Sequence, residues 1–185
     1  MEDNIEEKLQ RKLLDVQNFK RVCDLRESLV PVCPGLYAIQ IIDLNHLPEV
    51  FSQKLKAEGE NLIYIGKASK SLRKRLWKQE LHAQGHGTFF RSIGAVLGYL
   101  PERGSLKDKA NQNNFTFKEA DEEKIIAWIS QNLSINYVPC PPECIALESQ
   151  MIAEKCPIMN LQNNPCPFEP LKLLRQKCKE VAVGN

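Results

Sequence analysis

Residues 62–76 of the chain read LIYIGKASKSLRKRL. The first four residues are aliphatic, β-branched or aromatic and predict a short strand, which Gly66 ends. The apolar residues that follow recur at helical spacing and predict a helix over residues 71–84. A strand, a glycine and a helix in direct succession therefore form the centre of the predicted fold.

The same stretch carries a local concentration of positive charge. Between Lys67 and Lys78 there are six basic residues and no acidic one, although the net charge of the whole chain is only +2. Such a patch is the electrostatic pattern expected of a phosphate binder. A solvated helix face produces the same pattern, so the charge alone leaves both interpretations open.

The elements on either side of this stretch suggest a small mixed domain. An amphipathic helix is predicted over 4–28, and Pro31 and Pro34 end it. Two further strands are predicted at 35–42 and 135–138. Other helices are expected at 47–57, 88–98, 119–132, 143–155 and 170–180, with a loop at 101–118. This order of elements favours a compact α/β domain.

The composition is that of an ordinary globular domain, with 185 residues, 43% hydrophobic and 26% charged. No apolar run approaches the roughly 18 residues that a membrane-spanning helix needs. The acidic start of the chain lacks the apolar segment of a secretory signal. We therefore expect a cytoplasmic protein that has no membrane partner.

Seven cysteines are spread through the chain, an odd number that argues against a disulfide framework. The spacing of Cys140 and Cys144 would suit half of a zinc site, but Cys156 and Cys166 are too far apart for the usual second half. Reduced, partly buried thiols are the favoured interpretation. A zinc-stabilised interaction domain is the alternative.

Glu148 does not fit its surroundings in the predicted helix 143–155. At about 100° per residue its apolar neighbours lie within about 60° of it on both sides. Acidic residues are rarely buried unless they are paired or bind a metal. A functional carboxylate is therefore favoured over one that is paired with an interior cation. The neighbours are Cys144, Ile145, Met151 and Ile152.

Taken together, these features resemble the GIY-YIG nuclease family. Its two short motifs correspond here to Gly35-Leu-Tyr37 and Tyr64-Ile-Gly66. An essential arginine of the family, on the helix after the second motif, matches Arg75. The later metal-binding glutamate and the asparagine twelve residues beyond it match Glu148 and Asn160. Each motif is short, but the resemblance keeps five elements in the family's order over residues 34–160.

The resemblance implies an α+β fold with a small central, three-stranded, mostly antiparallel sheet that is flanked by helices. We expect an N-terminal helix over 1–30, a nuclease domain over 31–165 and a C-terminal helical tail over 166–185. Insertions are expected at about 43–60 and 82–118, and the second of them is a candidate for setting substrate choice.

The chain departs from the family pattern at several positions. Leu36 replaces the usual Ile or Val of the first motif, which is a conservative apolar change. One turn after the essential arginine many members carry Tyr or His, and this chain has Gln79 there. Two histidines, His82 and His86, follow further along. The identity of any auxiliary acid-base group therefore stays open.

The resemblance also implies a chemistry for these residues. Glu148 would bind one Mg²⁺ or Mn²⁺, a hard cation that prefers oxygen ligands and keeps several waters. Arg75 would bind the non-bridging phosphate oxygens. Tyr37 would accept the proton of the attacking water, Tyr64 would hydrogen-bond the water or the phosphate, and Asn160 would support the site.

The expected substrate is DNA, with RNA not excluded, and the expected state is a monomer or a homodimer. A nucleic-acid-binding module of the same fold that does not cut is the alternative function. Residues expected to contact the substrate are glycine or basic residues near the second motif and in the following segment: Gly66, Lys67, Lys70, Arg73, Lys74, Lys78, His82 and Arg91.

Overall fold

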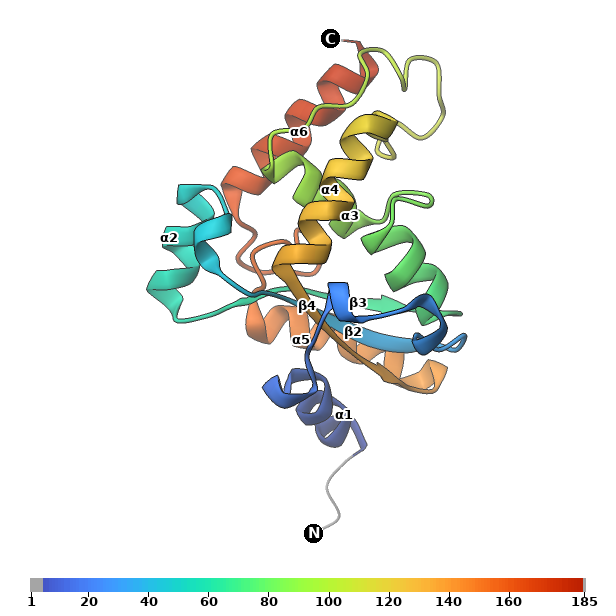
Figure 1. Ribbon diagram of the computed structural model, residues 1–185, viewed down its shortest axis with the longest axis vertical. Coiled ribbons are helices and arrows are strands. Elements are labelled where there is room, and N and C mark those ends of the chain that lie inside the picture. The colour runs from blue at the N-terminus through green and yellow to red at the C-terminus, as the bar shows by residue number, and fades with distance from the viewer. Residues whose placement is uncertain (1–4, 185) are drawn as a thin grey trace.

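A computed structural model of the chain describes residues 5–184. Its centre is one antiparallel sheet of four strands in the order β1-β4-β2-β3 (Figure 1). The α+β architecture expected from the sequence is confirmed, and the sheet has one strand more than expected. The strands are β1 (Lys20–Arg21), β2 (Gly35–Ile41), β3 (Leu62–Ala68) and β4 (Leu133–Pro139).

Helices cover both faces of this sheet (Figure 1). One face is covered by α1 (Ile5–Leu14) and α5 (Leu147–Lys155). The other face carries α2 (Glu49–Glu58), α3 (Thr88–Val96), α4 (Glu119–Asn132), α6 (Glu169–Val183) and the π-helix η5 (Arg73–Leu81). Short 3₁₀ turns are η1 (Val16–Asn18), η2 (Val22–Asp24), η3 (Glu27–Leu29), η4 (Leu44–His46) and η6 (Pro142–Ala146).

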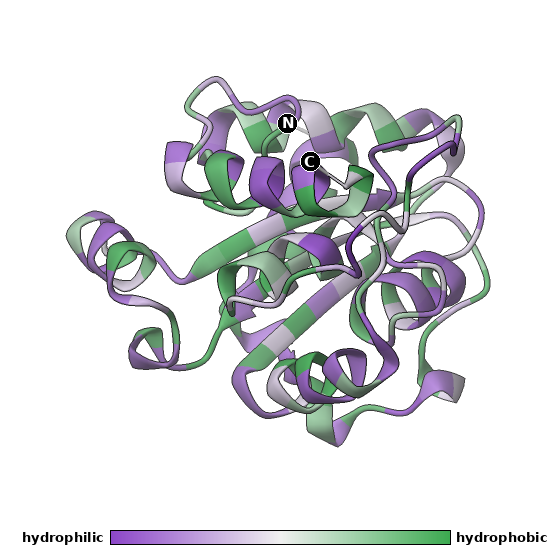
Figure 2. Cartoon of the chain, turned by 90° about the horizontal axis from the view of Figure 1, so that it is seen from above, coloured by the Kyte–Doolittle hydropathy of each residue, from purple (hydrophilic) through white to green (hydrophobic). Residues whose placement is uncertain are grey.

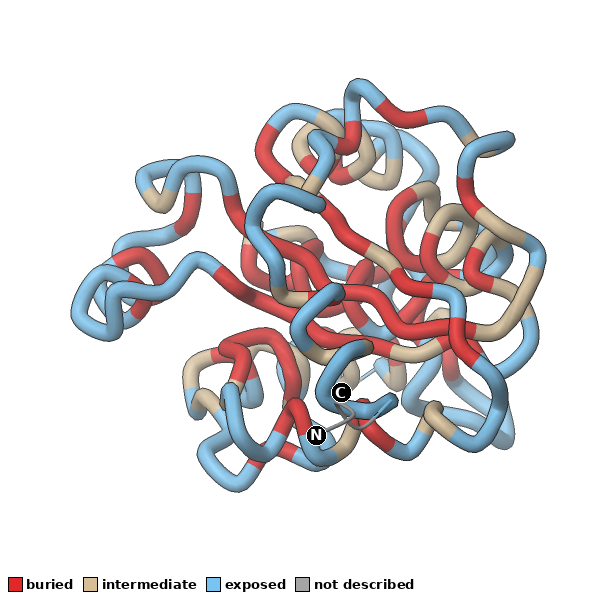
Figure 3. Tube along the Cα trace, turned by 90° about the horizontal axis from the view of Figure 1, so that it is seen from below, coloured by how far each residue is buried: buried red, intermediate tan, exposed pale blue. Residues whose placement is uncertain are grey.

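The inner strand β2 is buried along its whole length and contributes to two hydrophobic clusters. Figure 3 shows that buried residues gather in the middle of the molecule and exposed ones at its periphery. Successive side chains of a strand point to opposite faces. Leu36 and Ala38 accordingly pack in the cluster beneath α1 and α5, whereas Tyr37, Ile39 and Ile41 pack in the larger cluster on the other face. Figure 2 shows these strands as largely hydrophobic and much of the helical surface as hydrophilic.

The N-terminal segment differs from the single helix that its periodicity predicts. Helix α1 ends at Leu14, and the side chain of Asp15 then accepts a hydrogen bond from the amide of Gln17 at 3.0 Å. A side chain that bonds its own backbone in this way competes with helix continuation. Five residues later, Lys20 and Arg21 pair with β4. Pairing with the sheet therefore overrides the helical pattern in residues 15–28.

Two motif glycines let the strands and η5 approach closely. A Cβ on Gly35 would lie 2.6 Å from the side chain of Leu72 and 2.6 Å from the carbonyl of Val138. Gly66 is the register partner of Tyr37, and a Cβ there would collide with the tyrosine ring. The absence of a side chain on Gly66 therefore makes room for Tyr37.

None of the helices formed by residues 5–184 combines the length and the apolar character needed to cross a lipid bilayer.

Candidate active site

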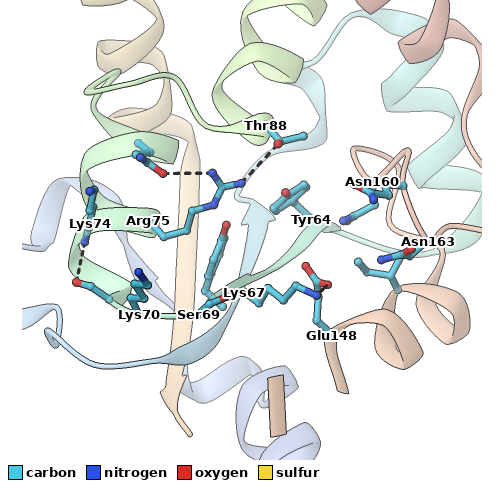
Figure 4. A pocket seen from close by; sticks show the side chains of 15 residues that line it. Tyr64, Lys67, Ser69, Lys70, Lys74, Arg75, Thr88, Glu148, Asn160 and Asn163 are labelled. Atoms are coloured by element: carbon cyan, nitrogen blue, oxygen red, sulfur yellow. Dashed lines mark hydrogen bonds and ion pairs between the residues drawn. The ribbon is translucent and has the colours of Figure 1, made fainter. Parts of the chain in front are cut away.

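A pocket of about 510 Å³ opens where the sheet meets η5, the start of α3 and α5 (Figure 4). Residues far apart in the sequence line it together. All five residues that the resemblance marks as catalytic belong to its lining: Tyr37, Tyr64, Arg75, Glu148 and Asn160.

A carboxylate that the sequence did not indicate organises one side of this pocket. Glu80 is fully buried, and its Oε1 lies 2.8 Å from the guanidinium of Arg75. The phenol of Tyr37 donates a hydrogen bond to the same oxygen at 3.1 Å. Glu80 thus connects the arginine and the tyrosine of the candidate site.

The second oxygen of Glu80 holds the beginning of α3. It accepts hydrogen bonds from the backbone amides of Phe89 at 2.8 Å and Phe90 at 3.3 Å. These amides belong to the first turn of α3, where backbone N–H groups have no partner within the helix. A Cβ on Gly87 would collide with the Glu80 carboxylate. The loop before α3 can therefore pack against this carboxylate only because residue 87 has no side chain.

The winding of η5 explains why Arg75 and Glu80 meet. In a π-helix the backbone hydrogen bonds join residues five apart, so residues i and i+5 lie on neighbouring turns. On an α-helix the same two residues would be separated by about 140° around the axis. Because the sequence predicts an ordinary α-helix here, helical periodicity could not identify Glu80 as a partner of Arg75.

Arg75 has two further contacts that fix its direction. Its Nη1 donates to the amide oxygen of Gln79 at 3.2 Å, and its Nη2 lies 3.5 Å from the hydroxyl of Thr88 (Figure 4). Gln79 occupies the position at which many family members carry Tyr or His. A side-chain amide neither ionises nor takes up a proton near neutral pH, so the contact of Gln79 with Arg75 supports orientation of the arginine and not acid-base chemistry.

Glu148 and Lys67 form the other side of the pocket. The Lys67 ammonium lies 3.0 Å from Oε2 of Glu148, whose side chain is 11% exposed. Glu148 lies among the apolar residues of α5, with Leu147, Met151 and Ile152 buried beside it. The carboxylate that the sequence places in the apolar stripe of a helix therefore lines the pocket. It is paired there with a lysine, which partly offsets its charge.

The two motif tyrosines lie between these sides. Tyr37 is fully buried and Tyr64 is 5% exposed, with ring centroids 6.2 Å apart. Burial, together with the negative charge of Glu80, raises the pKa of both phenols. Each phenol therefore stays protonated near neutral pH in this arrangement.

Asn160 supports the strand that carries the second motif. Its side-chain oxygen accepts from the amide of Ile65 at 3.0 Å, and its side-chain nitrogen donates to the Ile65 carbonyl at 2.8 Å. Ile65 lies directly between Tyr64 and Gly66. Asn160 therefore holds the backbone of the motif while lining the pocket.

The expected substrate contacts divide into two groups. Lys67, Lys70 and Lys74 line the pocket. Gly66 lies outside the lining, in β3, where the absence of a side chain leaves room for the ring of Tyr37. The remaining four residues lie outside the pocket lining, and each has its own local contact. Arg73 donates to the carbonyl of Val30, Lys78 pairs with Glu27, His82 contacts the carbonyl of Trp77, and Arg91 donates to the carbonyl of His86.

The cysteines form no recognisable metal centre. Within residues 5–184, no group of three or more His, Cys, Asp and Glu side chains is arranged to hold a metal ion. Cys140 is buried and Cys144 is half-buried, and both are free thiols.

The fold and the pocket define an α+β domain in which two motif tyrosines, an arginine and a helix-borne glutamate meet. A family model described as the GIY-YIG catalytic domain matches residues 35–179, so the chain belongs to the GIY-YIG family. Proteins of this family are generally endonucleases. No curated protein and no solved structure matched the chain.

Proposed function

We propose that the protein is a divalent-metal-dependent endonuclease that hydrolyses DNA phosphodiester bonds. The observation that carries this proposal is the placement of Arg75 and Glu148 on two sides of one pocket, with Tyr64 between them (Figure 4). A phosphate needs a cationic contact, and a hard metal ion needs an anionic oxygen ligand. The pocket supplies both across a space of about 510 Å³.

The residues around Glu148 fit a Mg²⁺ or Mn²⁺ ion. The pocket lining beside it offers oxygen donors, including the amides of Gln162 and Asn163, and no cysteine or histidine. Mg²⁺ is usually held by one or two carboxylates and keeps several waters, so a single glutamate suffices. When bound, the ion would supply Lewis acidity and offset negative charge on the phosphate.

Arg75 is suited to hold the scissile phosphate. Its side chain is 33% exposed, and its contacts with Glu80, Gln79 and Thr88 restrict the direction of the guanidinium. A planar guanidinium binds two phosphate oxygens at once. Because the arginine is already ordered, little conformational entropy is lost when the phosphate binds. Lys70 and Lys74 add positive charge at the same rim.

Tyr37 can act as a base only by passing on its own proton. Its phenol donates to Glu80 and its pKa is raised by burial, so a free phenolate is disfavoured. In the proposed step the water gives a proton to the phenol oxygen while the phenol proton moves to Glu80. The hydroxide attacks phosphorus, the bond to the leaving oxygen breaks, and that oxygen takes a proton from solvent. Glu80 then returns its proton to Tyr37, which releases its other proton to solvent, so that both groups regain their starting state.

Incubation of the purified protein with supercoiled plasmid and with single-stranded DNA tests this function. Mg²⁺ or Mn²⁺ should support nicking or linearisation, EDTA should prevent it, and Glu148→Ala should lack it. Salt-sensitive binding without cleavage by the wild type would instead identify a binding module. A single site cuts one strand at a time, so cleavage of both strands would require a second copy or a second event.

A further inference from the structure

A second groove, of about 270 Å³, lies beside α6 and outside the candidate active site. Three basic residues of the helix line it: Lys172, Arg175 and Lys179. The amides of Asn113 and Gln176 add polar groups, and no acidic residue belongs to the lining. The groove is therefore positively charged and rich in hydrogen-bond donors.

The three basic residues form one stripe. They follow at positions i, i+3 and i+7, which fall on the same side of an α-helix. At 1.5 Å per residue the stripe is about 10 Å long, a length over which one DNA strand carries about three charges. The ion pair of Lys172 with Glu169 is exposed and contributes little. Within residues 5–184, no acidic side chain pairs with Lys179.

Arg175 is fixed at the centre of the stripe. Its Nη1 donates to the carbonyl of Thr88 at 2.9 Å and to the hydroxyl of Ser92 at 3.0 Å, and its guanidinium lies 5.2 Å from the centre of the Phe115 ring. Burial and the nearby Arg91 lower the pKa of Arg175 to about 10, at which it is still cationic at neutral pH. Its contacts are neutral, so its charge is not offset by a carboxylate.

The groove and the candidate active site share a boundary. Thr88 lines the active-site pocket and contacts Arg75 through its hydroxyl, while its carbonyl accepts from Arg175. On the same boundary, Leu161 lines the groove, and its neighbours Asn160 and Gln162 line the active-site pocket. Two cationic cavities are thus separated by only a few residues.

We propose that a DNA strand leaving the active-site pocket continues along this groove, and that its phosphates bind to the basic stripe of α6. The inference rests on the proposed function, because a strand must first occupy the active site. Phosphate contacts of this kind fix the register of the substrate and carry no base specificity. They would let this compact domain bind phosphates of the substrate other than the scissile one.

Anisotropy of a fluorescein-labelled DNA duplex in EDTA tests the groove separately from cleavage. The test variant is Lys172→Glu with Lys179→Glu. Its matched control is Lys8→Glu with Lys12→Glu, because both are exposed residues of α1, which lies on the other face of the sheet from the groove. Both variants change the net charge equally, and thermal melting verifies that both are folded.

We expect the test variant to bind at least about tenfold more weakly at 0.1 M salt, with the salt slope of log K reduced by about 2. The control should stay within about twofold of the wild type. If test and control bind alike while Lys70→Glu with Lys74→Glu weakens binding, the groove inference is overturned and the proposed function stands. If the wild type binds no DNA, both are overturned.

Discussion

Two glutamates in this chain occupy buried surroundings and differ in every contact. Glu148 lies at the pocket surface, 11% exposed, with one lysine as its partner. Glu80 is fully buried and receives Arg75, the Tyr37 phenol and two backbone amides. Neither could be assigned a role from its burial alone. The hydrogen-bond and ion-pair partners distinguish the two roles. Glu148 has a carboxylate oxygen that can bind a group in the pocket, whereas both oxygens of Glu80 are engaged by other residues.

These contacts suit Glu148 to bind a metal ion and Glu80 to position other residues. A carboxylate with one exposed, exchangeable cation can release that cation and bind another. A buried carboxylate with four donors cannot lose one of them cheaply, since the remaining charge would be left uncompensated. We therefore expect changes at Glu148 to affect chemistry and changes at Glu80 to affect the fold as well.

Glu148→Gln is the substitution with the largest expected effect on activity. It keeps the shape of the side chain and removes the charge that a divalent ion requires. We expect cleavage to fall by about 10³-fold or more, since a bound metal ion contributes several kcal/mol to the transition state. The free energy of unfolding should change by less than about 1 kcal/mol, because only a partly exposed ion pair is lost.

Plasmid nicking rates and urea unfolding of the same preparations measure both quantities. A Gln variant that retains at least a tenth of the wild-type rate would remove Glu148 from the chemistry. A variant that is inactive because it is unfolded would show this in the urea curve.

Glu80→Ala should affect stability first. Breaking a buried ion pair by removing one partner costs about 3–5 kcal/mol, and here the amides of α3 also lose their acceptor. Cleavage should fall as well, because Arg75 and Tyr37 lose the group that orients them and Tyr37 loses the acceptor of its proton. Urea unfolding gives the first effect, and nicking at a temperature at which the variant is folded gives the second.

Gly87→Ala is the matched variant for this residue, because its methyl group displaces the Glu80 carboxylate without removing the charge. It should reproduce part of both effects. If Glu80→Ala is as stable as the wild type, the network described around Glu80 does not hold Arg75 and the first turn of α3 in place.

The sequence predicted much of this architecture, for identifiable reasons. Periodicity located the three longer strands and α4, because local hydrophobic pattern and tertiary burial agree there. It was wrong for residues 15–28, where pairing with β4 overrides helical spacing. The resemblance supplied all five pocket residues that it marked as catalytic.

The sequence could not predict Glu80, because its contact with Arg75 depends on π-helical winding, and that winding has no signal in residue spacing. Nor could it show that Arg73 and Arg91 lie outside the pocket, since Arg73 belongs to the same basic stretch as Lys70 and Lys74 and Arg91 is the one charged residue of α3. The direction of each side chain is set by a contact that residue spacing does not show, for Arg73 with the carbonyl of Val30 and for Arg91 with the carbonyl of His86.

Asn160 is an uncharged residue for which the same question arises, namely whether it takes part in the chemistry or only holds the backbone of the site. Asn160→Ala leaves both the amide and the carbonyl of Ile65 without their side-chain partner. We expect a loss of about 2–6 kcal/mol in the free energy of unfolding, from about 1–3 kcal/mol for each of the two buried groups. Asn160→Asp should also destabilise, because one carboxylate oxygen then faces the Ile65 carbonyl.

Urea unfolding of both variants, with nicking rates measured at saturating Mg²⁺, checks this role. Unchanged stability together with lost cleavage would make Asn160 a reacting residue and overturn the support role.

His86 is a third buried titratable residue. Burial favours its neutral ring, whereas the nearby carboxylate of Glu122 would favour the protonated one. The ring is 4% exposed, and its Nε2 lies 3.1 Å from Glu122 and 3.3 Å from the amide of Phe117. The amide can donate to Nε2 only when this nitrogen carries no proton, as in the neutral Nδ1–H tautomer, whereas the carboxylate can accept from Nε2 only when this nitrogen is protonated. Burial and the nearby Arg91 lower the pKa of His86 to about 4, which favours the neutral ring and the Phe117 contact.

The sign of the pH dependence follows from this direction. Between about pH 6.5 and pH 4 the unfolded chain binds a proton at His86 that the folded chain does not, so stability is lost as the pH falls through this window. The loss is at most about 3 kcal/mol, from 1.36 kcal/mol per pKa unit.

His86→Asn keeps a residue that tolerates the positive φ of this position and removes the titration. Urea unfolding of both proteins at several pH values should therefore show a loss in the wild type that the variant lacks. If the wild type instead gains stability relative to the variant as the pH falls, the ring is protonated in the fold, and Glu122 rather than burial determines its charge.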